Sequence, residues 1–249
     1  MKILVPMAGP SALFDEAGFA YPKNLVEIDG RPLAEQVLEQ LRPLVNRGAD
    51  LICLVREDES RRFHTADAIR LLYPAATVLD IPALESGAAC SALLAIDCIA
   101  RDEPLLVYNG DQVVEEDLLA ICDQFSAGDL DAGVVVFDAV HPRWSYVKTD
   151  PAGLVIEAAE KRPISRLATA GSYWYRRGGD FLDAVMSMIL KDASVEGRFF
   201  ICPAFNEMIL RQARIGTHAM ARERYFSLAT PQGVAIYEEH LAARRGRPD

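Results

Sequence analysis

Residues near the start of the chain have the types and spacing expected of a phosphate-binding loop. An apolar run at 3–7 leads into a turn containing Ala8 and Gly9, and Lys23 follows in a short loop. A glycine-containing turn after a strand exposes backbone N–H groups to phosphate oxygens, and a nearby lysine adds positive charge. This segment therefore predicts a phosphate site, provided that other parts of the chain supply a metal ligand and a second cation.

Asp111 is the candidate metal ligand. It follows Asn109 and Gly110 directly after the apolar run 104–108, which we expect to be a buried strand. Open α/β sheets bind ligands at the carboxyl ends of their strands. One carboxylate there suits Mg²⁺, which commonly takes one or two carboxylates together with water and substrate phosphates. The alternative is a solvated aspartate in a turn.

Two further segments are candidates for substrate binding. Glu160 and Lys161 follow a predicted hairpin and could bind a sugar hydroxyl and a phosphate, although an exposed charged turn has the same pattern. The segment Glu85-Ser86-Gly87-Ala88-Ala89 begins a predicted helix without bulky side chains. Small residues let a flat base approach the backbone, and the helix amino end favours negative charge. Close helix packing explains these small residues equally well.

The composition limits the classes of partner. The chain has 249 residues, 51% of them hydrophobic and 25% charged, as in a folded protein. Its formal net charge of −10 disfavours binding to nucleic acid or to an anionic membrane. No apolar stretch is long enough to span a bilayer. The five cysteines are scattered without a C-x-x-C pair, as expected of reduced thiols in a cytoplasmic protein.

Apolar runs alternate with helical patterns through the first half of the chain, which predicts an α/β fold with a mostly parallel sheet. The expected strands are 3–7, 50–55, 76–81, 104–108, 132–137, 168–175 and 215–221, with a hairpin at 145–150 and 154–158. The expected helices are 31–45, 59–73, 87–100, 115–125, 179–190, 203–212 and 230–243. We expect one domain over residues 1–243 and a frayed tail over 244–249.

The order of these motifs resembles the sugar-phosphate nucleotidyltransferase family, which includes glucose-1-phosphate thymidylyltransferases and uridylyltransferases. The matching segments run from residue 1 to about 175: Pro6-Met7-Ala8-Gly9, Pro22-Lys23-Asn24-Leu25, Gly87-Ala88-Ala89, Asn109-Gly110-Asp111 and Glu160-Lys161. A weaker match to the late L-G-T-P motif is Leu228-Ala229-Thr230-Pro231. The resemblance implies a Rossmann-like three-layer fold of the GT-A type.

A branch of this family associated with capsule and surface polysaccharides, including cytidylyltransferases, is similar in three segments. These are Trp144-Ser145-Tyr146-Val147, Glu160-Lys161-Arg162-Pro163-Ile164-Ser165 and Ile201-Cys202-Pro203-Ala204-Phe205-Asn206-Glu207. The resemblance implies that CTP, UTP or dTTP reacts with a sugar phosphate or a similar small phosphorylated acceptor. It leaves open whether the chain forms a homo-oligomer.

The resemblance also implies roles for individual residues. A phosphate oxygen of the acceptor attacks the α-phosphate of the NTP and pyrophosphate leaves, so the protein positions the groups and neutralises charge. Lys23 would neutralise the phosphates, Asp111 would hold Mg²⁺ and Lys161 would bind the acceptor phosphate. The other implied residues are Ala8, Gly9, Ser11, Gly87, Ala88 and Gly110 for the nucleotide, and Glu160 and Gly171 for the acceptor.

Two departures from the family pattern keep alternative functions open. Ser11 and Leu13 stand where the family loop has its second glycine and its arginine, and Ser227 replaces a second metal carboxylate. Arg162 or Arg166 could supply the missing cation. Otherwise the enzyme is slow, or the chain is a non-catalytic nucleotide- or sugar-phosphate-binding paralogue. A metal-dependent glycosyltransferase of the same broad fold ranks last, because Asn109-Gly110-Asp111 matches the required D-x-D only loosely.

Overall fold

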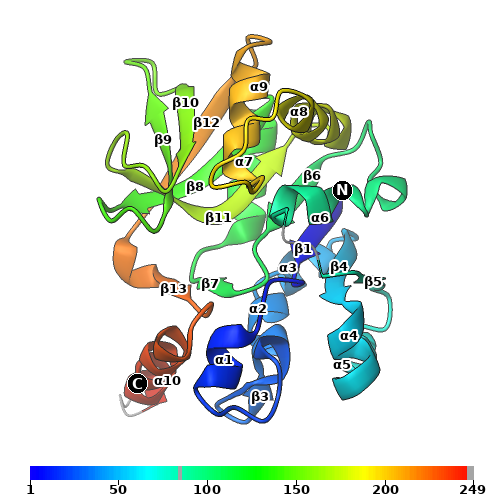
Figure 1. The fold of residues 1–249 in the computed structure, drawn as a ribbon. Coiled ribbons are helices and arrows are strands. Elements are labelled where there is room, and N and C mark those ends of the chain that lie inside the picture. Colours follow the sequence, from blue (N-terminus) through cyan, green and yellow to red (C-terminus); the bar gives the residue numbers. More distant parts are fainter. Residues whose placement is uncertain (84–85, 246–249) are drawn as a thin grey trace.

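The structure of the protein is a computed structural model that describes residues 1–83 and 86–245 (Figure 1). Its centre is a nine-stranded sheet. Four neighbouring strands run parallel in the order β6-β1-β4-β5. Their bounds are β1 (Lys2–Pro6), β4 (Asp50–Arg56), β5 (Thr77–Ile81) and β6 (Leu105–Tyr108).

The second half of the chain extends the sheet beyond β6. The long strand β11 lies antiparallel to β6 on one side and to β8 on the other, and β12 pairs parallel with β8. The β9–β10 hairpin joins the first part of β11. The bounds are β8 (Ala132–Asp138), β9 (Ser145–Thr149), β10 (Val155–Glu160), β11 (Leu167–Tyr175) and β12 (Ile215–Met220). All sheet strands except β10 and β11 therefore point the same way, which confirms the expected mostly parallel sheet.

Helices cover both faces of the sheet, so the fold has the three layers that we expected. In β1, Ile3 and Val5 face one apolar core and Leu4 faces the other, because side chains alternate along a strand. The first core is closed by α2 (Leu33–Glu39), α3 (Arg42–Asn46), α5 (Thr65–Leu72) and α7 (Leu118–Ala127). The second is closed by α6 (Ala88–Leu93), α8 (Gly178–Leu190) and α9 (Phe205–Ile209).

Two predicted helices are each broken in two. The helix expected over 31–45 begins only at Leu33, after the short strand β3 (Arg31–Pro32), and is divided before Pro43, which lies in the first turn of α3. Proline has no N–H and cannot continue a preceding helix. The helix expected over 59–73 divides into α4 (Glu57–Phe63) and α5 at His64, whose φ of 59° is left-handed. The helix expected over 87–100 ends at Leu93 and is followed by the 3-10 turn η2 (Ile96–Cys98).

Several short elements that the apolar pattern did not predict surround the carboxyl edge of the sheet. They are α1 (Ala12–Glu16), the 3-10 turn η1 (Lys23–Leu25), β2 (Glu27–Ile28), β7 (Gln112–Val114), η4 (Arg222–Arg224) and β13 (Tyr225–Ser227). The pairing of β7 with β13 is antiparallel and brings residues 112 and 227 together. This pairing returns the late part of the chain to the end of β6.

The closing helix α10 (Pro231–Arg245) includes Arg244 and Arg245, which we expected in a frayed tail. Arg244 forms an ion pair of 2.7 Å with Glu115, so this end of the helix has a tertiary contact. Residues 246–249 lie outside the described part. Among the described residues, no helix combines the length and the apolar character that crossing a bilayer requires.

Candidate functional site

The ends of β1 and β6 lie against each other and position the candidate metal ligand. Gly110 donates its N–H to the carbonyl of Pro6 at 3.2 Å. A Cβ on Gly110 would stand 2.6 Å from that carbonyl oxygen and 2.5 Å from Met7 Cγ. Only glycine allows this approach, and the next residue, Asp111, is thereby held at the carboxyl edge of the sheet, where the sequence predicted it.

Lys23 and Asp111 form an ion pair at this edge, with 2.7 Å between Nζ and Oδ2. The Lys23 side chain is 4% exposed and that of Asp111 is 31% exposed, so the ammonium is enclosed while the carboxylate faces solvent. A Cβ on Gly9 would lie 3.1 Å from Lys23 Nζ, which shows that the ammonium lies directly beside the Gly9 turn. The structure thus brings together Gly9, Lys23 and Asp111, three of the predicted site residues.

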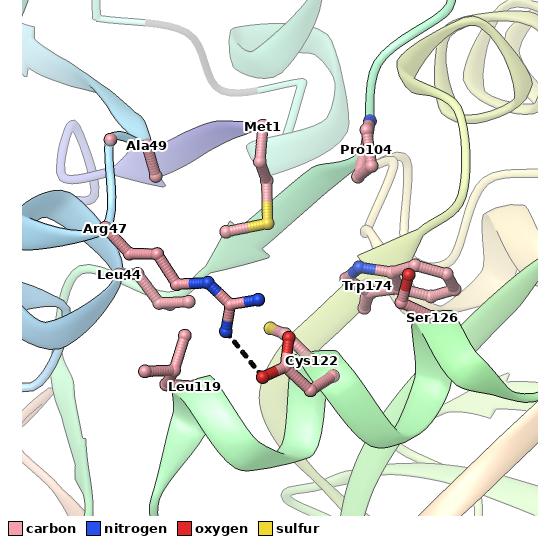
Figure 2. Close-up of a pocket in the computed structure, with 11 residues that line it drawn as sticks. Met1, Leu44, Arg47, Ala49, Pro104, Leu119, Cys122, Ser126 and Trp174 are labelled. Atoms are coloured by element: carbon pink, nitrogen blue, oxygen red, sulfur yellow. Dashed lines mark hydrogen bonds and ion pairs between the residues drawn. The ribbon is translucent and has the colours of Figure 1, made fainter.

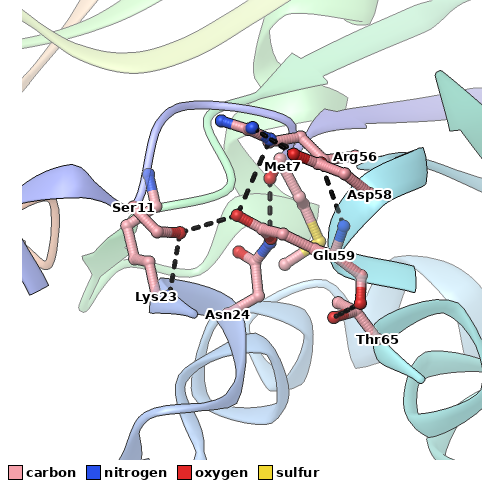
Figure 3. A network of polar contacts seen from close by, with 8 residues as sticks. All are labelled: Met7, Ser11, Lys23, Asn24, Arg56, Asp58, Glu59 and Thr65. Atoms are coloured by element: carbon pink, nitrogen blue, oxygen red, sulfur yellow. Dashed lines mark hydrogen bonds and ion pairs between the residues drawn. The ribbon is translucent and has the colours of Figure 1, made fainter. Parts of the chain in front are cut away.

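A buried polar network holds the backbone of the lysine loop (Figure 3). Ser11 Oγ accepts a hydrogen bond from the Lys23 N–H at 3.0 Å and donates one to Glu59 Oε1 at 2.8 Å. Asn24 Nδ2 donates to the carbonyl of Met7 at 2.9 Å. The Ser11 hydroxyl is therefore bonded within the protein, so that any contact of Ser11 with a nucleotide falls to its backbone.

Glu59 is the charged member of this network. It is 6% exposed, and one of its oxygens has no hydrogen-bond partner within the described residues. The Arg56 guanidinium lies 3.8 Å from its other oxygen. Burial raises the pKa of Glu59 above 4.5, and the Ser11 hydroxyl and Arg56 only partly oppose that rise. This role of Glu59 could not be predicted from the sequence, because Glu59 lies within a charged helical segment.

A cleft of about 800 Å³ opens beside Asp111. Of the predicted site residues it is lined by Ala88, Asp111, Glu160 and Lys161, which come from three separate segments of the chain. Gly87 lies at the start of α6, where an added Cβ would meet the Phe199 carbonyl at 2.4 Å. Its small size is required by this packing, and Ala88 is the residue of that segment that faces the cleft. Glu85 lies outside the described residues.

Glu160 and Lys161 stand at the end of β10. Glu160 accepts a hydrogen bond from the Ser145 hydroxyl, and its burial raises the pKa of its carboxyl group. Lys161 has a left-handed φ of 54° and its ammonium pairs with Glu196 at 2.5 Å. Residues other than glycine rarely adopt this conformation, and when they do they are concentrated at binding and catalytic sites.

Gly171 lies in an irregularity of β11 and contacts the segment that carries Asp111. Pairing between β11 and β8 shifts register between Thr169 and Tyr173. Gly171, with φ of 59°, accepts the N–H of Asn109 at 2.9 Å, and Gln112 Nε2 donates to the carbonyl of Ala170 at 2.6 Å. Gly171 therefore supports the turn around Asp111.

The cleft also contains residues that the sequence did not single out by themselves. Arg143 and Arg222 line its wall together with Trp144 and Tyr225. Arg222 lies in a short charged run that reads as a solvated turn, and Arg143 precedes a segment noted only for its family resemblance. No sequence spacing relates the two arginines: Arg143 lies between β8 and β9, and Arg222 lies just before β13, which pairs with β7.

The structure also shows where the residues that depart from the family pattern, and their expected replacements, lie. Ser227 lines the cleft, and Leu228 donates its N–H to the carbonyl of Asp111 at 2.8 Å, so a serine stands beside the candidate metal ligand. The Leu13 side chain is 51% exposed. Arg162 and Arg166, the expected replacement cations, form ion pairs with Glu157 and Asp138 and do not line the cleft.

The residues at the cleft fit Mg²⁺ bound together with a phosphorylated ligand. The described residues contain no group of three or more histidine, cysteine or carboxylate side chains placed to hold a metal ion. Asp111 uses one oxygen for Lys23 and faces the cleft. One carboxylate, the neighbouring Ser227 hydroxyl and oxygens of phosphate and water are a ligand set that Mg²⁺ accepts.

A second pocket, of about 150 Å³, lies at the opposite edge of the sheet (Figure 2). Met1, Ala49 and Pro104, which precede β1, β4 and β6, line it. The Arg47 guanidinium at its wall pairs with Asp123 at 2.5 Å. The pocket lies away from the strand ends that carry Asp111, so it takes no part in the candidate site.

The sequence matches the MobA-like NTP transferase domain family over residues 4–174. The chain belongs to this family. The match includes the Gly9 turn, Lys23, Asp111, Glu160, Lys161 and Gly171. Nucleotidyl transfer is therefore the chemistry of its family, as the resemblance implied. A search of curated protein sequences found no match.

Solved structures confirm the fold. A nucleoside-diphosphate-sugar pyrophosphorylase from Vibrio cholerae RC9 is 24% identical, with a TM-score of 0.81 over 95% of this chain and 99% of that one. A UDP-glucose pyrophosphorylase complexed with UDP-glucose is 15% identical, with a TM-score of 0.76 and 98% of both chains covered. A UDP-glucose pyrophosphorylase from Acinetobacter baumanii is 16% identical, with a TM-score of 0.73 over 99% of this chain and 94% of that one. At these identities the likeness establishes the Rossmann-like fold alone.

Proposed function

We propose that the protein transfers a nucleoside monophosphate from an NTP to a sugar phosphate or related phosphorylated acceptor. A phosphate oxygen of the acceptor forms a bond to the α-phosphorus, the bond from the α-phosphorus to its bridging oxygen breaks, and pyrophosphate leaves with that electron pair. The observation that carries the proposal is the ion pair between Lys23 and Asp111 at the ends of β1 and β6. It supports the proposal because a cation and a carboxylate lie together at the carboxyl edge of the sheet, the edge at which open α/β sheets bind ligands.

Lys23 acts on the phosphates in this proposal. Its ammonium is enclosed beside the Gly9 turn, so it is already desolvated and oriented before substrate arrives. A preorganised charge of this kind stabilises the charge that develops on the phosphoryl group. Asp111 would hold Mg²⁺, which would supply further neutralisation of phosphate charge. Ala8, Gly9, Ser11, Gly87, Ala88 and Gly110 form the nucleotide side of the site.

The acceptor occupies the part of the cleft beyond Asp111. Glu160, fixed by Ser145, accepts hydrogen bonds from acceptor hydroxyls, and Lys161 leaves Glu196 to bind anionic oxygen. Gly171 supports this side through Asn109. The NTP is CTP, UTP or dTTP in this proposal, and the product serves capsule or surface-polysaccharide synthesis in the cytoplasm. The capsule assignment rests on the segments around Trp144, Glu160 and Ile201.

A non-catalytic nucleotide- or sugar-phosphate-binding role is the second candidate. It is favoured by Leu13, which leaves the loop without its family arginine, and by Ser227, which gives the metal one fewer carboxylate. An arginine cannot be replaced by leucine at a phosphate, because the charge and the paired donors are both lost.

Pyrophosphate exchange separates the two. Radiolabelled pyrophosphate is incubated with the protein, Mg²⁺, and each of CTP, UTP, dTTP, GTP and ATP in the presence of glucose 1-phosphate or other sugar phosphates. We expect label to enter one NTP. Measurable NTP binding without exchange for any base or acceptor would favour the binding role, while transfer of sugar from an NDP-sugar would indicate a glycosyltransferase.

A further inference from the structure

Two arginines in the cleft have no acidic partner within the described residues. Arg143 is exposed and Arg222 is partly buried, and both line the cleft wall together with Lys161. Among residues 1–83 and 86–245, the only side-chain hydrogen bond of Arg222 is donated to the carbonyl of Tyr225, at 2.8 Å. By contrast, the Lys161 ammonium pairs with Glu196. The two guanidinium groups are therefore the cations most available to a ligand in the cleft.

An aromatic cluster holds these guanidinium groups in place. Phe137, Trp144 and Tyr225 pack together, with ring centroids 4.8 to 5.5 Å apart. The Arg143 guanidinium carbon lies 4.3 Å from the Trp144 ring centroid, and that of Arg222 lies 5.8 Å from the same centroid and 5.1 Å from that of Phe137. Stacking on a ring leaves the edge of a guanidinium, with its N–H donors, free to bind an anion.

The carboxylates around the cleft do not cancel this charge. Asp111 is paired with Lys23, and the carboxyl of Glu160 accepts the Ser145 hydroxyl. Glu223, the third acidic residue that lines the cleft, is exposed to solvent. Within the described residues, none of these carboxylates forms an ion pair with Arg143 or Arg222, so the wall carries two guanidinium charges in a chain whose overall charge is −10.

The position of this wall selects the ligand. Lys23 and the Gly9 turn do not line the cleft. Its lining includes Ala88, Asn109 and Asp111 together with residues from the segments 143–145, 160–161 and 222–236. The arginine wall and Asp111 therefore line the same cleft, whereas Lys23 and the Gly9 turn lie outside its lining. We infer that Arg143 and Arg222 bind the phosphomonoester group of the acceptor, an inference that rests on the proposed function and deepens it.

Lys161 has a smaller part in this arrangement. An ammonium held by Glu196 must give up that contact before it can bind phosphate, whereas guanidinium groups that are already stacked need no rearrangement. A phosphomonoester dianion offers the paired oxygens that a guanidinium fork binds best. The aromatic wall also makes contact with the apolar face of a sugar or another small organic group.

Direct binding of glucose 1-phosphate and of inorganic phosphate, measured by titration calorimetry on the full chain, tests this inference. We expect Arg143→Gln to weaken glucose 1-phosphate binding at least tenfold, and the double variant with Arg222→Gln to weaken it further. Lys161→Gln should weaken it less than either. The control is Arg101→Gln, whose arginine pairs with Asp183 outside the cleft, and it should bind as the unchanged chain does.

Arg222 packs on three rings, so its replacement could disturb the wall. Arg222→Lys keeps a positive charge at that position. Because Arg143 is exposed, Arg143→Gln should not disturb folding, so it measures the effect of one arginine on binding alone. Unchanged affinity in Arg143→Gln and in the double variant would overturn the inference. Absence of any phosphate binding by the unchanged chain would do so as well.

The test of the two arginines and the test of the proposed function can succeed or fail independently of each other. If no NTP supports pyrophosphate exchange but glucose 1-phosphate binding depends on Arg143, the arginine wall is supported and catalysis is not. If exchange occurs, the arginine variants should raise the KM for the acceptor and leave the KM for the NTP within about twofold. If these variants support exchange with an unaltered KM for the acceptor, the proposed enzymatic function is kept and the inference about the two arginines is refuted.

Discussion

Lys23 and Asp111 are 88 residues apart in the chain and 2.7 Å apart in the fold. Neither residue is unusual in its local sequence, and both are explained by the meeting of β1 and β6. The close approach at Gly110 fixes Asp111, and the bond from the Lys23 N–H to Ser11 fixes the lysine loop. The positions of these two charged side chains therefore depend on uncharged residues, Gly110 and Ser11.

Replacing Lys23 with alanine should lower kcat by about 10² to 10³-fold, the usual effect of removing one preorganised group that stabilises a transition state. The fold should remain, because Asp111 is 31% exposed and water can solvate it once its partner is gone. Steady-state kinetics and thermal unfolding measure both effects. Lys148→Ala, at an exposed position on β9, serves as the control. Normal turnover in Lys23→Ala would place the active site elsewhere.

Asp111→Asn should reduce the stimulation of turnover by Mg²⁺. The amide keeps the size of the side chain but loses the charge that a hard cation prefers. Turnover measured over a range of Mg²⁺ concentrations should show a midpoint shifted at least tenfold upward or lost altogether. A variant with the same Mg²⁺ midpoint would remove Asp111 from the metal site.

Glu59 should make the stability of the protein depend on pH. Its pKa in the folded protein is raised above the ordinary 4.5. As the pH rises, Glu59 therefore loses its proton in the unfolded chain before it does so in the folded protein, and this shifts the equilibrium toward the unfolded chain. The free energy of unfolding should therefore fall as the pH rises from about 4.5 through the folded pKa. Glu59→Gln keeps an acceptor for Ser11 and removes the titration. Urea unfolding at pH 4 to 7 should show the variant gaining stability relative to the parent, and parallel curves would contradict this.

At the scale of elements, the irregularity in β11 links the two halves of the site. β11 pairs with β6 through its second half and with β9 through its first, so the strand changes partner near Gly171. The shift in register there leaves the carbonyls of Ala170 and Gly171 free to bind Gln112 and Asn109. The hairpin that ends at Glu160 and the turn at Asp111 are therefore fixed relative to each other by one strand.

Gly171→Ala should damage both folding and activity. An added Cβ would lie 2.2 Å from Gln112 Oε1 and 2.4 Å from Asn109 Nδ2, and φ is 59°. The left-handed conformation costs about 1–2 kcal/mol for alanine, and overpacking adds about 1–3 kcal/mol. Gly153→Ala is the matched control, since Gly153 has φ of 83° and nothing within 4 Å. Chemical denaturation should show a larger loss for Gly171→Ala, and equal losses would mean that the packing is not tight.

At the scale of the whole molecule, segments that follow the part of the chain matched by the family complete the candidate site. The match ends at residue 174, but β12 covers the edge of β8, and β13 pairs with β7 beside Asp111. α8 and α9 cover the second apolar core. Arg222 and Ser227 also belong to this later part, so the cleft is complete only with residues 175–236.

A chain ending at Tyr175 should not fold cooperatively. It would expose β8 as an edge strand and uncover the core side of β11, and unpaired apolar edges favour aggregation. Urea unfolding followed by circular dichroism should give a broad transition or none. A chain ending at Arg245 keeps every described element and should unfold sharply. A sharp transition in the shorter chain would show that residues 1–175 are self-sufficient.

The sequence by itself determined the buried strands, their alternation with helices and the order of the phosphate and metal motifs. These features are local, since apolar runs and glycine turns act over a few residues. It also singled out Lys23, Asp111, Glu160 and Lys161, whose roles stay predictions. It did not predict β7 and β13, because strands of three residues carry too little pattern to be distinguished from loops.

Only the tertiary structure decided which groups act together. The bond between Ser11 and Glu59 spans 48 residues, and Arg143 and Arg222 approach each other across separate elements. The same charged residues read as solvated turns when only their neighbours in the chain are considered. Burial and ion pairing give them different roles, because whether a cation is available to a ligand depends on contacts made between distant segments.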